Sequence, residues 1–89
     1  MMDFTAREHT CIDETGAPLT FHYHLLCDTA EYGDRLIPDY GIAVSSSQGE
    51  HIQIPHISPD FHRVADLLTL LCEQAVSPIH LRDVVDDWL

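Results

Sequence analysis

The feature that most constrains the fold is a change of hydrophobic period along the chain. Residues 1–57 carry apolar side chains at alternate positions, whereas residues 58–89 carry them at the three- and four-residue spacing of a helix. Alternation is typical of half-buried strands, and the longer period is typical of amphipathic helices. The sequence therefore predicts strands first and helices second, which is the order of an α+β domain.

Four strands are predicted in the first part. They span about residues 3–12, 19–27, 38–45 and 51–55. Short links with turn-forming residues join them, among them Gly16 and Gly49. Strands joined this tightly pair antiparallel. We therefore expect a four-stranded meander with the strands in chain order.

Two helices are predicted in the second part, over about residues 59–75 and 78–88. The dipeptides Ser58-Pro59 and Ser77-Pro78 each place a capping hydroxyl before a proline that suits the first helical position. Helices this short need a sheet to cover their apolar stripes. We expect both on one face of the sheet, in a single two-layer ββββαα domain over residues 1–89.

The charge balance limits the partners. The chain has 15 acidic residues against four bases, for a net charge of -11. Nucleic acid and anionic membranes both need a basic face, so neither is expected as a direct partner. No apolar run is long enough to span a bilayer, and the start does not resemble a signal peptide. We expect a cytoplasmic protein with reduced thiols that meets another protein or a second copy of itself.

The histidines suggest a metal site. Centring the first hairpin on its turn pairs Ile12 with Leu19, sets His9 opposite His22, and puts His24 and Cys11 on the same outer face. Imidazole and thiolate ligands in such a group suit zinc. The alternative is an ordinary polar sheet face, since no C-x-x-C or H-E-x-x-H motif accompanies these residues.

The same outer face carries a strip of small residues on the third predicted strand, including Gly41 and Ala43. Small side chains let another backbone or helix approach closely. We therefore expect an interface there, with a second copy or with a partner segment. The alternative is that the glycine marks a β-bulge.

The C-terminal helix is strongly acidic. Asp86 and Asp87 lie at the end where the helix dipole disfavours negative charge, and Asp83 shares a face with Asp87. Together with His80 and Arg82, these acids form a candidate docking surface for a basic protein. The alternative is a solvated face that serves solubility.

The C-terminal run from Val76 to Leu89, with Tyr40-Gly41-Ile42 in the middle, resembles a family of short uncharacterised proteins from Clostridium-like Firmicutes. The members end in a similar Pro-x-His-Leu-Arg-Asp-Val helix followed by acids and an aromatic residue. The resemblance implies a cytosolic bacterial protein without an assigned activity, and it draws attention to residues 80–83. This chain departs from the pattern by lacking lysine and by having many histidines.

No catalytic group is predicted, because the chain contains no nucleophile motif and no phosphate-binding glycine loop. A chain of this size also has little volume for a deep pocket. The sequence predicts a small acidic accessory or regulatory protein that acts through protein contact without a cofactor. The alternative is a zinc-type metal-binding protein that uses the histidine patch.

Overall fold

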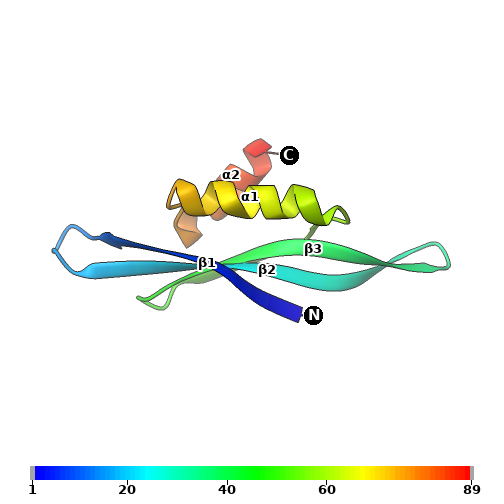
Figure 1. The fold of residues 1–89 in the computed structure, drawn as a ribbon, viewed down its shortest axis with the longest axis horizontal. Coiled ribbons are helices and arrows are strands. Elements are labelled where there is room, and N and C mark those ends of the chain that lie inside the picture. The colour runs from blue at the N-terminus through cyan, green and yellow to red at the C-terminus, as the bar shows by residue number, and fades with distance from the viewer. Residues whose placement is uncertain (1, 89) are drawn as a thin grey trace.

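The computed structural model describes residues 2–88, with the backbone alone for residues 2–6. The elements in chain order are β1 (Met2–Ile12), β2 (Pro18–Tyr32), β3 (Arg35–Ser46), β4 (His51–Ser58), α1 (Phe61–Glu73), the 3-10 turn η1 (Pro78–His80) and α2 (Leu81–Trp88). The strands form one antiparallel sheet in the order β1-β2-β3-β4, and the helices lie on one of its faces (Figure 1). The predicted α+β class and meander are confirmed. Positions 1 and 89 of the predicted domain lie outside the described residues.

The β1–β2 turn sets a register that differs from the predicted one. Asp13 accepts hydrogen bonds at Oδ1 from the backbone N–H groups of Thr15 and Ala17, at 2.9 and 3.0 Å. This turn pairs Ile12 with Pro18, so the predicted pairing of Ile12 with Leu19 is wrong by one residue. Side chains alternate between faces, so a shift of one residue moves the side chains of residues 7–12 to the other face. Ile12 is accordingly 67% exposed rather than buried.

The core lies between the middle of the sheet and α1. Alternate residues of β2 and β3 point toward the helices, and α1 turns one apolar stripe toward them. The buried cluster consists of Phe21, Tyr23, Leu25, Ile42, Val44, Val64, Leu67, Leu68, Leu71, Val76, Leu81 and Val85. The Tyr23 hydroxyl donates to the backbone carbonyl of Val76 at 2.9 Å, which links the sheet to the segment before α2.

The helix starts differ in detail from the serine caps predicted above. Asp60 caps α1, and its Oδ1 accepts from the N–H groups of His62 and Arg63. Ser58 lies before the N-cap and positions it, since the Ser58 Oγ accepts a hydrogen bond from the N–H of Asp60 at 3.1 Å. Ser77 makes no side-chain capping bond to η1. A carboxylate at the N-cap accepts hydrogen bonds from free N–H groups and also interacts favourably with the positive end of the helix dipole. Asp60 therefore stabilises the start of α1 more than an uncharged serine would.

The β2–β3 hairpin is much longer than the sequence indicated. Its strands were predicted to end at residue 27 and resume at 38, yet pairing continues to Tyr32 and Arg35 across a two-residue turn. Gly33 takes the left-handed conformation in that turn, with φ of 68°. Among the described residues, β1 pairs no farther than Cys27 and β4 pairs no farther than Tyr40. Residues 29–38 therefore continue as a two-stranded β2–β3 ribbon, which contributes to a shape of 53 × 23 × 18 Å (Figure 1).

Candidate functional site

Two of the predicted metal ligands lie together on the open face of the sheet. His22 and His24 are alternate residues of β2, and their rings are 6.5 Å apart. His22 faces Glu8 across the β1–β2 ladder, with 3.5 Å between Nδ1 and Oε2. A carboxylate beside an imidazole forms an ion pair only when the ring is protonated.

The other two predicted ligands lie on the opposite face. His9 pairs with Phe21 and Cys11 pairs with Leu19, so both share the side that faces the helices. Cys11 is half-buried and packs against the core. The structure thus separates His9 and Cys11 from His22 and His24. Among the described residues, no group of three histidine, cysteine or carboxylate side chains could hold a metal ion.

The small-residue strip is covered within the single chain. Gly41 is buried, and a Cβ placed on it would lie 2.6 Å from Pro55 Cα and closer still to the carbonyl oxygen of Ile54. Ala43 is only 1% exposed. The glycine therefore allows β4 of the same chain to approach. An interface at this strip stays a prediction, and it would have to use the longer side chains around these two residues.

The predicted acidic surface faces solvent. Asp83, Asp86 and Asp87 are exposed on α2, while Leu81 and Val85 of the same helix are buried. Arg82 is exposed beside them, and His80 is exposed in η1. The structure thus leaves these five residues accessible to a partner.

The β2–β3 ribbon carries an uncovered continuation of the core face. Along β3 the side chains that face the helices are those of Val44, Ile42, Tyr40, Pro38 and Leu36, by strict alternation. The first two are fully buried, but α1 begins at Phe61 and does not cover the last two. Leu36 is consequently 70% exposed. A core-type residue is thus presented to solvent beyond the helix layer.

Aromatic side chains mark the inner end of this apolar row. The rings of Tyr40 and Phe61 meet edge to face with centroids 5.5 Å apart, and Phe61 is 45% exposed. Clustered aromatic and aliphatic residues are the groups that protein interfaces bury at their centres. We call the surface formed by Leu36, Pro38 and Phe61 the ribbon surface.

The ribbon and the residues that flank it, 28 and 39, are acidic. Residues 28–39 contain four carboxylates and one base, Arg35. The carboxylates are those of Asp28, Glu31, Asp34 and Asp39. Glu31 pairs directly with Leu36, so a negative charge borders the exposed leucine on the same face. A partner at this surface would meet apolar groups edged with negative charge.

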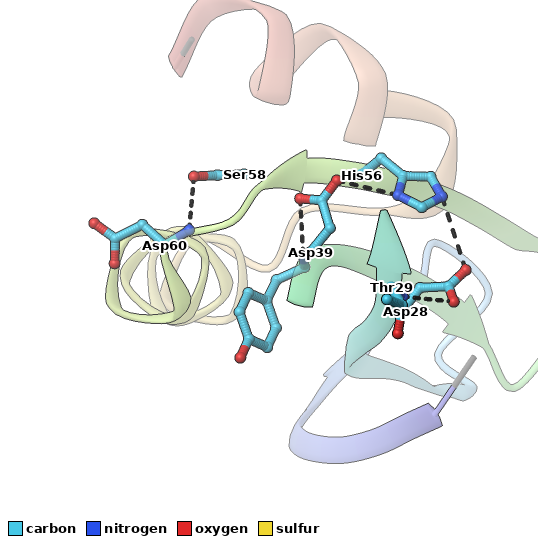
Figure 2. A network of polar contacts seen from close by, with 7 residues as sticks. Asp28, Thr29, Asp39, His56, Ser58 and Asp60 are labelled. Carbon is cyan, nitrogen blue, oxygen red and sulfur yellow. Dashed lines mark hydrogen bonds and ion pairs between the residues drawn. The ribbon is translucent and has the colours of Figure 1, made fainter. Parts of the chain in front are cut away.

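A polar network ties three strands together where the ribbon leaves the sheet. His56 of β4 lies between two carboxylates that are cross-strand neighbours, Asp39 of β3 and Asp28 of β2 (Figure 2). Its Nδ1 is 3.1 Å from Asp39 Oδ2, and its Nε2 is 3.8 Å from Asp28 Oδ2. Asp39 is only 4% exposed, and its Oδ1 also accepts from the N–H of Tyr40. A buried carboxylate requires such partners.

An irregular segment of β4 brings His56 to this position. Ile42 pairs with Ile54 and Tyr40 pairs with Ser58, so three β4 residues face Gly41 alone. His56 takes the left-handed conformation in this bulge, with φ of 57°. The left-handed conformation is energetically unfavourable for a non-glycine residue, and such strain is often found at functional positions. The bulge therefore aims the imidazole across β3 toward β2.

The sequence prediction missed both the ribbon and the network. The second strand was predicted to end at residue 27 and the third to begin at residue 38, with residues 31–34 as the turn between them. His56 was placed just beyond the end of the last strand, predicted to span 51–55. The usable indications were Pro55, which disfavours a regular strand, and the glycine at 41, which permits a bulge opposite it.

Neither helix of the described range has the length and hydrophobicity needed to cross a membrane. No curated protein and no solved structure matches the chain significantly. One family model does match, and it covers residues 2–89, which is nearly the whole sequence. The chain therefore belongs to DUF6514, a family of unknown function.

Proposed function

We propose that this chain is a small acidic accessory protein that binds a basic protein partner through the ribbon surface. The observation that carries this proposal is the exposure of Leu36. This residue lies on the core-facing side of β3, yet it is 70% exposed because α1 begins at Phe61 and does not cover it. An apolar side chain from a partner, placed beyond Phe61, would continue the helix layer over the ribbon. The exposed leucine would then be removed from water, which favours binding.

Charge supports a basic partner over a second copy. Each chain has a net charge of -11, so two copies repel one another. Lysine and arginine side chains beside a central apolar group would instead face Glu31 and Asp34. Complementary charges accelerate association and select among partners. The acids of α2, Asp83, Asp86 and Asp87, add to the same long-range attraction.

The size of the surface supports a transient contact. Stable interfaces bury about 800 Å² on each partner around a cluster of anchor residues. Leu36, Pro38 and Phe61 supply a small cluster on a narrow ribbon. A regulatory or accessory contact of modest affinity fits this surface better than a permanent assembly.

Site-specific photo-crosslinking in the cells that naturally produce the protein tests this function. A photoreactive phenylalanine replaces Leu36 in one variant and Ile12 in a matched control. Ile12 suits the control because it is 67% exposed and lies on β1, outside the ribbon. We expect a discrete adduct with a basic protein from position 36 only. The same adduct should disappear when Glu31→Lys and Asp34→Lys reverse the charge beside the ribbon surface.

Three outcomes would overturn the proposal. The first is no adduct from position 36, and the second is the same adducts from both positions. The third is an adduct of twice the 10.1 kDa chain mass, which would identify a second copy as the occupant. Persistence of the adduct after charge reversal would contradict the basic character of the partner.

A further inference from the structure

We infer that His56 is a pH-dependent tie that holds the β2–β3 ribbon to β4, and so regulates the order of the ribbon surface. The inference rests on the proposed function only for its biological use, because the tie itself exists in the free chain. His56 joins β4 to Asp39 and Asp28 at the last point where the ribbon still has neighbours. Beyond that point the ribbon is a two-stranded structure, which is only marginally stable by itself.

The two ring nitrogens of His56 face two carboxylates, and this geometry makes protonation important. Within the described residues, the charged groups that face the ring are Asp39 from β3 and Asp28 from β2. A neutral imidazole has one N–H, which can donate to Asp39 while the other nitrogen turns a lone pair toward Asp28. A protonated ring donates from both nitrogens. Both carboxylate contacts are therefore attractive at the same time only in the protonated state.

The surroundings keep the ring in place in both states. Gly41 allows the backbone of Ile54 and Pro55 to approach, and the bulge sets His56 in its left-handed conformation. Asp39 is buried and retains its bond from the N–H of Tyr40. Protonation thus changes the strength of the contact with Asp28 more than the position of the ring. We expect the ribbon to be more ordered in mild acid than at neutral pH.

Amide hydrogen exchange of the isolated chain tests the tie without any partner. Protection factors, corrected for the intrinsic pH dependence of exchange, are compared at about pH 7.5 and about pH 5.5, on either side of ordinary histidine titration. We expect the ribbon amides of residues 29–32 and 35–37 to gain about twofold to fivefold in protection at the lower pH, as for one partly exposed ion pair. Core amides such as those of Val44 and Leu67 should not gain by the same factor.

Three variants make the result specific. His56→Asn removes the imidazole while keeping a residue type that tolerates the left-handed conformation, so the bulge is preserved. It should abolish the pH-dependent gain, and Asp28→Asn should reduce the gain, because protonation of His56 then strengthens only the contact with Asp39. The control is His51→Asn, an exposed histidine of the same strand, which should retain the gain.

Two outcomes would overturn the tie. One is an equal gain in the wild type and in His56→Asn, and the other is an equal gain in ribbon and core, which would indicate a general relief of charge repulsion. Either result leaves the photo-crosslinking at position 36 unaffected. A failed crosslink, in turn, would not alter the exchange data, so the two failures are distinguishable.

Discussion

The two halves of the β2–β3 hairpin differ in what covers them. Both halves pair antiparallel in one continuous register from Phe21–Ser46 to Tyr32–Arg35. In the inner half the side chains that face the helices are buried under α1, whereas in the outer half Leu36 lies in solvent. Backbone pairing alone therefore does not determine burial. The position at which α1 begins separates a core from a candidate contact surface.

The largest expected difference between the two halves comes from leucine truncation. Leu67→Ala, at a fully buried position, should lower the free energy of unfolding by about 2–5 kcal/mol because it leaves a cavity. Leu36→Ala should change it by no more than about 0.5 kcal/mol, because its side chain is already exposed. Denaturant titration measures both values. Similar losses from the two variants would show that the ribbon leucine is covered in solution.

Substitutions at two glycines test the role of the β4 bulge, which lies opposite Gly41 where the inner half of the hairpin meets the outer half. Gly41→Ala should destabilise the fold by about 1–3 kcal/mol, since its Cβ would press on the backbone of Ile54 and Pro55. The matched variant Gly33→Ala has open space at the ribbon tip but an unfavourable positive φ, and it should cost about 1–2 kcal/mol. Exchange near His56 should change only in Gly41→Ala. An undisturbed β4 in that variant would contradict the close approach.

The inner half also depends on one buried hydrogen bond. Tyr23→Phe removes the hydroxyl that donates to the carbonyl of Val76, so it should lower the free energy of unfolding by about 1–2 kcal/mol. Chemical denaturation at neutral pH measures the loss. A variant as stable as the wild type would mean that water replaces the donor at Val76.

The same tyrosine predicts an alkaline limit. Burial raises the pKa of Tyr23 above its ordinary value near 10. Because the unfolded chain ionises first, the stability that the neutral phenol contributes is present below about pH 10 and is lost as the pH rises beyond it. The wild type should therefore lose more stability than Tyr23→Phe between about pH 9 and about pH 11. Parallel losses would contradict burial of the hydroxyl.

The smallest expected effect concerns the contact between the two helices. The guanidinium carbon of Arg63 lies 4.6 Å from the ring centroid of Trp88, in a cation–π contact between α1 and α2. Arg63→Ala should cost about 0.5–1 kcal/mol and should alter the fluorescence of the one tryptophan. Arg82→Ala, at an exposed position on α2, serves as the control. Equal effects of the two variants would argue against the contact.

The fold class could be predicted because it depends on local patterns. Alternation over β2 and β3 and the helical stripe of α1 each appear within a short window of sequence. The register could not be predicted with the same success. It depends on how Asp13 folds the turn, and a difference of one residue there separated His9 and Cys11 from His22 and His24. The predicted metal patch failed to assemble for this reason.

The candidate site was less predictable than the fold because its parts come from distant strands. The predicted acids of α2 are exposed, but the ribbon surface joins a β3 leucine to an α1 phenylalanine, and the tie joins residues 28, 39 and 56. Nothing in a local window relates these positions. Their meeting follows from strand order and from the bulge opposite Gly41.

The sequence by itself determined the order of strands and helices, their two-layer arrangement and the strong negative charge, because these properties follow from residue type and short-range periodicity. Only the tertiary structure decided which apolar residues are covered and which carboxylates share an imidazole. Coverage depends on where Asp60 starts α1 relative to the end of the sheet. The meeting of His56 with Asp28 and Asp39 depends on a backbone bulge that exists only after β3 and β4 have paired.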